Sequence, residues 1–363
     1  MKSFVKRNGV WIGFLLLAIA VTLLTMDWNL MESRFLSPRN LTNVLRQTSI
    51  NGVLAAGMTL VILTGGIDLS IGSIVAVCGI VVGISQLHWG WSEMGALGCV
   101  GSILLSVAVG TMAGVVNGGL VSMLGIAPFV ITLGMMVIAR GLALILSGGS
   151  GISPMGEAFR YVGEEYLSTV PTAILTATVL GLVLWRFRKD LREASFPILT
   201  CAVFAYAFVQ YKGFPIQVLF LVVSLASMAF LLTYTTLGRS IYAIGSNEQA
   251  AHWAGVPIRR VKWIVYSIMG LFSGLAGALL TARLNGAVPT AGQLAELDAI
   301  AAVVIGGTSL KGGVGTILGS FVGALTIATL NNGMDLLEVP SFYQMVFKGI
   351  IIILAVGLDR GQR

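Results

Sequence analysis

Charged residues are scarce in this sequence, and their scarcity excludes a soluble globular domain. Of the 363 residues, 10% are charged, whereas soluble domains carry about 25%. Hydrophobic residues make up 56% and gather in runs of about 18 residues or more, long enough to cross a bilayer. Because these runs are continuous and do not alternate with polar residues, they favour helices over a transmembrane barrel. We therefore expect an all-α, polytopic integral membrane protein.

Histidine and cysteine are also rare, which removes the usual ligands and nucleophiles of an active site. The two histidines are His88 and His252, and the three cysteines, expected to be packing residues, are Cys78, Cys99 and Cys201. No zinc spacing, HExxH, P-loop or nucleophile-elbow motif occurs. We expect no enzyme, no catalytic residue, no metal site and no cofactor. Without a P-loop, any energy for transport must come from another subunit or from an ion gradient.

The apolar runs predict one transmembrane domain over residues 1–363, a helical bundle of about 10 to 12 segments with some helices short or broken. Twelve segments can be marked, at 10–26, 48–64, 70–87, 95–115, 126–147, 170–186, 196–210, 215–236, 263–283, 296–308, 314–332 and 342–358. Segment 296–308 is too short for a full crossing. With the N-terminus inside, most of the 22 Lys and Arg residues lie on the inner side, so both termini are expected to be cytoplasmic. The net charge of +7 thus fits membrane topology and predicts no nucleic-acid partner.

Polar connections between the segments have structure of their own. Residues 27–47 predict an interfacial helix, capped by Ser37, that leads into the second span, and residues 148–169 predict an outer loop. TGGIDLSIGSIVA at 64–76 resembles IGGTSLKGGVGTILG at 305–319, and the predicted topology places both turns on the same side. An internal repeat and chance similarity in a chain with 46 glycines both remain open.

Asp68 is the one charge in the apolar stretch 52–88, and two roles fit it. In the first, the preceding glycine pair ends one span and Asp68 caps the next, accepting a hydrogen bond from the amide of Ser70 or Ile71. In the second, the carboxylate lines a pathway and meets the hydroxyls of a solute. The two roles are compatible.

Other polar side chains within the spans extend this candidate pathway. Asparagine amides offer weak, reversible hydrogen bonds, although each can equally serve a helix–helix contact worth about 0.6–2 kcal/mol. Arg140 and Lys348 also lie within spans, where each needs a partner or a buried carbonyl, and Glu296 opens the short segment as a first-turn carboxylate. The candidate pathway residues are Asn51, Asp68, Ser70, Asn117, Asp298, Thr308, Asn331 and Asn332.

The stretch IGSNEQAAHWAGVPIRRVK at 244–262 predicts a short cytoplasmic helix. Asn247 is placed to cap it, with Glu248 in its first turn. Glycine and proline after the helix stop it. Its expected small-residue face consists of Ala250, Ala251 and Ala254. From the residues alone, a docking element for a groove on a partner and an ordinary interfacial helix are both open.

The same stretch resembles the coupling segment in membrane subunits of ATP-binding-cassette (ABC) importers for monosaccharides. The ribose permease typifies this family. Three further stretches also resemble it: GMTLVILTGGIDLSIGS at 57–73, PTAGQLAELDAIAAVVIGGTSLKGG at 289–313 and NNGMDLLEVPSFYQMVFKGIIIILAVGLD at 331–359. The resemblance covers most of residues 1–150 and 230–359. Region 187–214 looks like an insertion relative to the ribose-type permease and resembles the longer layout of xylose-type permeases.

The resemblance implies a multi-pass permease subunit in the bacterial cytoplasmic (inner) membrane that translocates a pentose such as xylose or ribose, or a related sugar. Implied partners are an ABC ATPase subunit whose ATP hydrolysis drives transport, a periplasmic or lipid-anchored sugar-binding protein, a second permease copy or close paralogue, and membrane lipid. The coupling segment spans 243–262, with implied ATPase contacts at Gly245, Asn247, Glu248, Ala250, Ala251, Ala254 and Gly255. The alternative is a stand-alone secondary transporter or channel for a small polar solute.

Overall fold

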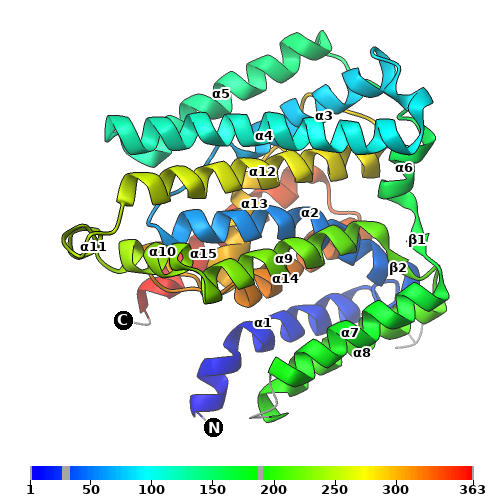
Figure 1. The fold of residues 1–363 in the computed structure, drawn as a ribbon. Coiled ribbons are helices and arrows are strands. Elements are labelled where there is room, and N and C mark those ends of the chain that lie inside the picture. Colours follow the sequence, from blue (N-terminus) through cyan, green and yellow to red (C-terminus); the bar gives the residue numbers. More distant parts are fainter. Residues whose placement is uncertain (1, 27–32, 187–190, 362–363) are drawn as a thin grey trace.

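Helices form almost all of the regular structure in the computed structural model, which describes residues 2–26, 33–186 and 191–361 (Figure 1). Within these residues the helices are α1 Lys2–Leu24, α2 Pro38–Leu63, α3 Ile71–Leu87, the 3-10 helix η2 Trp91–Met94, α4 Ala96–Leu124, α5 Pro128–Ser147, α6 Glu157–Glu164, α7 Thr169–Arg186, α8 Leu191–Gln210, α9 Ile216–Tyr234, α10 Thr236–Ser246, α11 Glu248–Trp253, α12 Ile258–Leu284, α13 Ala295–Ile305, α14 Ile317–Leu336 and α15 Ser341–Gly361. Two short strands, β1 Tyr166–Leu167 and β2 Phe214–Pro215, pair antiparallel.

All twelve apolar segments marked in the sequence fall on helices. Five of these helices, α4, α5, α9, α12 and α14, are long and apolar enough to cross a membrane. Figure 1 shows the long helices lying roughly side by side, with α11 at one end of the bundle and α6, β1 and β2 at the other. The predicted all-α, polytopic membrane architecture is confirmed.

The centre of the bundle is built by α2 and α12. Leu54 and Met58 of α2 are buried in the main core together with Tyr266 and Met269 of α12. Helix α4 packs along α12 so closely that a β-carbon on Gly110 would overlap the backbone of α12 at Gly270 and Gly274. Small residues allow this approach between membrane helices, where packing rather than the hydrophobic effect drives association. Cys78 and Cys99 are buried packing residues, as expected.

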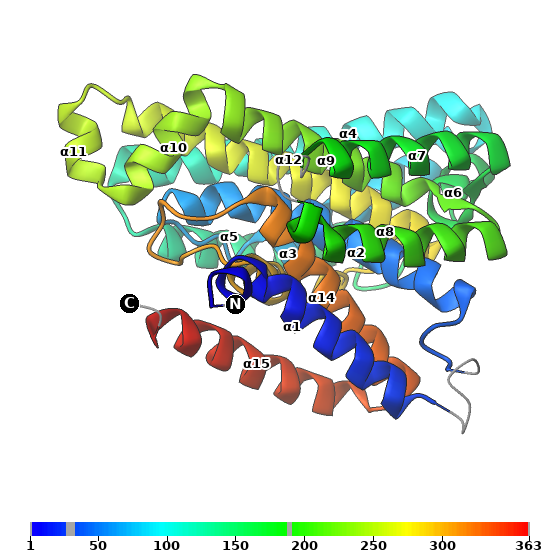
Figure 2. The ribbon, with the colours of Figure 1, turned by 90° about the horizontal axis from the view of Figure 1, so that it is seen from below.

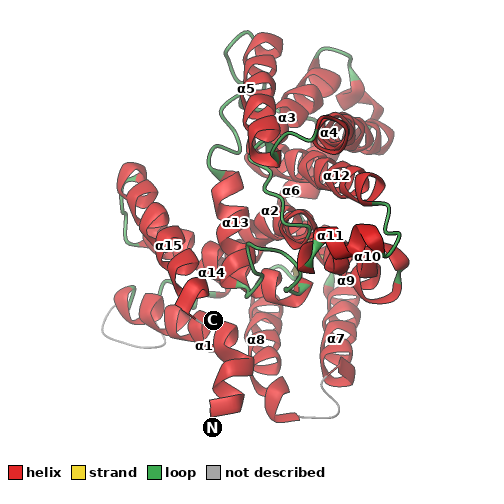
Figure 3. Ribbon diagram, turned by 90° about the vertical axis from the view of Figure 1, so that its left-hand side faces the viewer, coloured by secondary structure: helices red, strands yellow, loops and turns green. Residues whose placement is uncertain are grey.

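Two chain reversals interrupt the spans near the α11 end. The segment between α2 and α3 covers residues 64–70, and the segment between α13 and α14 covers residues 306–316. Helix α13 has 11 residues, so it is about 16 Å long, against about 30 Å for the hydrocarbon core. It therefore ends part-way, as its sequence length predicts. Viewed from the α11 end, α13 and α14 lie between α2 and the outlying α15 (Figure 3).

Figure 2 shows α1 and α15 on the same face of the bundle. At the start of the second span, the structure corrects the sequence-based expectation. Helix α2 runs unbroken from Pro38 to Leu63, so residues 38–47 are its first turns and not a separate interfacial helix; residues 27–32 lie outside the described part of the chain. Ser37 occupies the N-cap position, but its hydroxyl donates to the carbonyl of Arg34 instead of capping.

Two predicted connections gain detail. The expected outer loop at 148–169 contains α6 and β1. In region 187–214, residues 187–190 lie outside the described part of the chain, and α8 packs against α7, α2 and α1. That this region is an insertion stays a prediction.

Candidate functional site

Asp68 sits between α2 and α3 in a buried chain of hydrogen bonds. Its Oδ1 accepts from the backbone amide of Ser70 at 2.9 Å and from the Ser70 hydroxyl at 2.6 Å. The side-chain amide of Asn117, on α4, donates to the same hydroxyl at 2.9 Å. Asp68 is 1% exposed, and Ser70 and Asn117 are fully buried. The predicted hydrogen bond from the Ser70 amide is confirmed, but the predicted cap is wrong: Ser70 holds the N-cap position of α3, and Asp68 lies three residues before the helix begins at Ile71.

The Asp68 cluster, defined as Asp68, Ser70 and Asn117, retains unused hydrogen-bonding capacity. The Oδ1 of Asn117 and the hydroxyl of Tyr266 are both buried without a partner among the described residues. The Tyr266 hydroxyl packs against Gly66, where a β-carbon would lie 2.5 Å from it. A buried polar atom without a partner costs about 1–3 kcal/mol. The cluster is thus a polar site enclosed by protein at a break in the helices.

A second cluster joins α13, α14 and α15. The ammonium of Lys348 lies 2.9 Å from Oδ2 of Asp298, and the amide of Asn331 donates to the same oxygen at 3.4 Å. This pair supplies the partner that Lys348 requires within the membrane. Asp298 lies in the first turn of α13, where the helix dipole also favours a negative charge.

Arg140 is satisfied by carbonyls, as the sequence predicts. Its Nη1 donates to the carbonyl oxygens of Pro289 at 2.6 Å and Ala291 at 3.0 Å. Glu296 lies in the first turn of α13, as expected. Arg140 therefore fixes α5 to the irregular segment that precedes α13.

The remaining candidate pathway residues lie apart from these two clusters. Asn332 exchanges two hydrogen bonds of 2.8 Å with Asn40 on α2, which ties α14 to the start of α2. Asn51 is partly buried within α2. The hydroxyl of Thr308 is buried without a partner in the described residues, next to Gly315. The eight candidates thus form two clusters and three separate positions.

A cavity of about 830 Å³ opens at the start of α2, at the end of the bundle opposite α11. Its lining includes three arginines and three tyrosines: Arg34, Arg39, Arg46, Tyr166, Tyr206 and Tyr211. The Arg46 guanidinium lies over the ring of Tyr166, 5.9 Å from its centroid. Sequence reasoning counted these arginines only as topology charges. Their spacing within one outer segment was the available signal for a cationic site.

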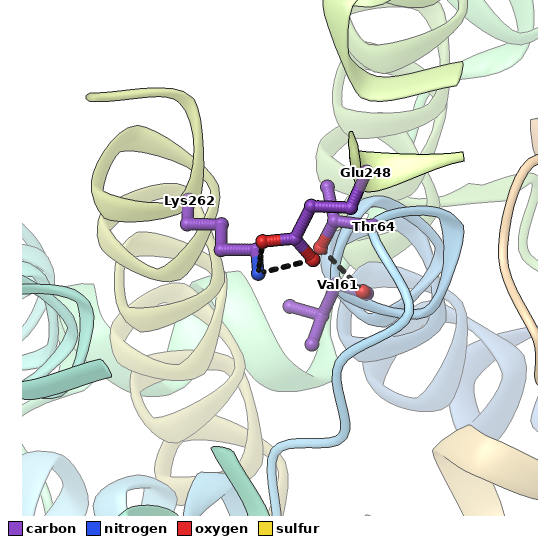
Figure 4. A network of polar contacts seen from close by, with 4 residues as sticks. All are labelled: Val61, Thr64, Glu248 and Lys262. Carbon is purple, nitrogen blue, oxygen red and sulfur yellow. Dashed lines mark hydrogen bonds and ion pairs between the residues drawn. The ribbon is translucent and has the colours of Figure 1, made fainter. Parts of the chain in front are cut away.

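The short helix at the opposite end has the predicted cap. Oδ1 of Asn247 accepts from the amide of Ala250 at 2.9 Å, and Gly255, with φ of +81°, ends the turn. Glu248 pairs with Lys262 at the start of α12, at 2.8 Å (Figure 4). Figure 4 also shows the end of α2, where the Thr64 hydroxyl bonds to a carbonyl one turn earlier.

The predicted small-residue face is wrong for one of its members. Ala250 and Ala254 are exposed, but Ala251 is 5% exposed and belongs to the main core. Gly245 likewise packs against the protein's own backbone. Trp253 on α11 is a large apolar side chain that is 77% exposed, and sequence reasoning did not select it. An indole ring in a polar cytoplasmic segment was the signal that could have found it.

Among the residues that the structure describes, no three His, Cys, Asp or Glu side chains gather where they could hold a metal ion.

The comparisons with known proteins cover nearly the whole chain. A family model described as "Branched-chain amino acid transport system / permease component" matches residues 40–356. The xylose transport system permease protein of Haemophilus influenzae is 38% identical over an alignment 375 positions long, which covers 99% of this chain and 98% of the relative. Its counterpart in Escherichia coli strain K12 is 36% identical over 98% of this chain and 93% of the relative. The ribose import permease protein of Bacillus subtilis is 40% identical over 98% of this chain and 93% of the relative. No solved structure matches the chain.

Proposed function

The chain belongs to the permease family that this model and these relatives represent, and on that premise we propose that it is the membrane-spanning subunit of an ABC importer for a monosaccharide. The observation that carries the proposal is similarity over nearly the full length to permeases named for xylose and ribose. The family description names branched-chain amino acids, but these relatives are named for pentoses. A pentose or a related sugar is therefore the proposed substrate.

The proposed partners meet opposite ends of the bundle. An ATPase subunit binds the end that carries α11, where Trp253, Ala250 and Ala254 are exposed. A sugar-binding protein delivers its cargo at the other end, where the cationic cavity suits acidic groups on that protein. In Figure 1 the described ends of α1 and α15 lie toward the α11 end, which supports two cytoplasmic termini. A second permease copy completes the proposed assembly.

Transport proceeds by alternating access in this proposal. Closure of the ATPase pair moves α11, and the two interrupted helix pairs rearrange around a pathway that includes the Asp68 cluster, Asp298 and Asn331. Irregular backbone at membrane depth is tolerated where it is enclosed by protein or lines a cavity, which suits such a pathway. The buried Asp68 cluster corresponds to a conformation in which this part of the pathway is closed.

Reconstitution tests the proposal. The permease, the ATPase and the binding protein are placed in proteoliposomes, and uptake of radiolabelled xylose and ribose is followed with ATP inside and with a non-hydrolysable analogue as the control. We expect uptake only with ATP and only with the binding protein. Uptake that needs neither component would favour a stand-alone transporter or channel and overturn the proposal.

A further inference from the structure

Three segments that are distant in the sequence meet at the α11 end of the bundle, at a contact we name the glycine junction. It consists of Leu63 at the end of α2, Tyr242 and Gly245 near the end of α10, and Gly313 and Gly315 in the segment between α13 and α14. The Gly313 amide donates to the Leu63 carbonyl at 3.0 Å. The Tyr242 hydroxyl donates to the Gly315 carbonyl at 2.9 Å.

Gly245 brings these backbones into direct contact. A β-carbon at this position would overlap the Leu63 carbonyl oxygen and the Gly313 amide nitrogen, the two atoms that form the hydrogen bond between the end of α2 and the segment 306–316. Gly313 has φ of +72°, a conformation that glycine adopts without strain. The close approach therefore depends on glycine at both positions.

The junction is firmly connected to α11. Asn247 alone separates α10 from α11, and it caps the latter. Ala251 is buried in the main core, and the pair between Glu248 and Lys262 links α11 to α12. Because Asn247 alone joins the two helices, displacement of α11 must displace the end of α10 as well.

The junction is equally close to both helix breaks. Leu63 is followed by the segment 64–70 that carries Asp68, and Gly313 belongs to the segment 306–316 that carries Thr308. The hydrogen bond thus joins Gly313, in the similar stretch 305–319, to the last residue of α2, directly before the stretch 64–76.

We propose that Tyr242 and Gly245 are positioning residues that transmit displacement of α11 to both helix breaks at once, through the backbone of the glycine junction. The inference rests on the proposed importer function, because it assigns to this contact the step between ATP hydrolysis and opening of the sugar pathway. One rigid contact moves both breaks together, so neither half of the pathway opens alone.

Two matched pairs of variants test the role. Tyr242→Phe removes one hydrogen bond and keeps the ring, and its control is Tyr234→Phe, the same change at an exposed position on α9. Gly245→Ala adds a methyl group inside the junction, and its control is Gly134→Ala, a helical glycine with open space around it. The measurement is the number of ATP molecules hydrolysed per sugar imported, with copurification of the ATPase recorded for every variant.

We expect Tyr242→Phe to raise the ATP-to-sugar ratio about 2- to 10-fold, as expected for loss of one hydrogen bond. Gly245→Ala should raise it further, while both controls keep the wild-type ratio and all variants still bind the ATPase. An unchanged ratio in Tyr242→Phe, or an equal rise in Tyr234→Phe, would overturn the proposal. If Gly245→Ala fails to insert in the membrane, Tyr242→Phe decides alone.

A second readout separates this inference from the proposed function. Hydrogen exchange of the peptide covering residues 306–316 is measured on the purified permease alone. Tyr242→Phe should accelerate it at least about 2-fold relative to Tyr234→Phe, whatever drives transport. Wild-type uptake without ATP would refute the importer function, and equal exchange in the two variants would refute the junction.

Discussion

Replacing Lys348 by methionine tests the ion pair that fastens α15 to the half-helix α13. The Lys348 ammonium lies 2.9 Å from Asp298, and the side chains are 20% and 12% exposed. Without Lys348, the Asn331 amide, at 3.4 Å, is the one side-chain partner left to the carboxylate among the described residues. Removing one partner of a fully buried pair costs about 3–5 kcal/mol. Because both side chains retain some exposure, we expect a loss at the lower end, about 3 kcal/mol.

The double variant Lys348→Met, Asp298→Asn should recover most of this loss. It leaves no uncompensated charge, and an asparagine at 298 can still accept from Asn331, so its stability should lie within about 1 kcal/mol of wild type. Unfolding in mixed detergent micelles, followed by tryptophan fluorescence, measures all variants. Lys311→Met, at an exposed loop position, is the control for the loss of a lysine. The single variant Asp298→Asn completes the comparison. Single variants within about 0.5 kcal/mol of wild type, or a double variant as unstable as the sum of the two single variants, would refute the reasoning.

The remaining predictions concern the helix break and the α11 end. Asp68→Asn should fold and keep uptake, because its Oδ1 still accepts from Ser70. Asp68→Ala should lower the stability by about 1–3 kcal/mol, and equal stability of the two variants would contradict the role of this hydrogen bond in the turn before α3. Trp253→Ala should weaken ATPase copurification at least roughly 30-fold, as for a hot-spot tryptophan, and Trp89→Ala at the opposite end should not. Ala254→Glu should uncouple ATP hydrolysis from uptake in a stably inserted protein. Ala251→Glu should instead lower the melting temperature, since it buries a charge, and a normal melting temperature would count against the observed packing.

Much of the architecture followed from hydropathy alone. All twelve apolar segments are helices, because lipid offers no hydrogen bonds and each segment must satisfy its own backbone. The same argument identified 296–308 as a partial crossing. It misjudged residues 38–47, where polar residues at the start of α2 continue the helix without a break because they face protein and the outer cavity, not lipid.

Contacts between residues close in sequence were predictable, and contacts between distant ones were not. The bond from Ser70 to Asp68 and the Asn247 cap join residues two or three apart, so residue type and spacing determine them. The partner of Lys348 lies 50 residues away, and that of Asn40 lies 292 residues away. Only the packing of α13 and α14 against their neighbours brings these groups together.

Sequence by itself determined a membrane bundle of helices, the places where helices break, and the polar residues at those breaks. It also marked two similar glycine-rich turns without showing that they touch. Only the tertiary structure places the Gly313 amide within hydrogen-bonding distance of the Leu63 carbonyl, with Gly245 packed against both groups. It also decides that Ala251 is buried while Trp253 is exposed. Helical periodicity gives the angle between neighbouring side chains, but which face meets protein depends on helices that pack from elsewhere in the chain.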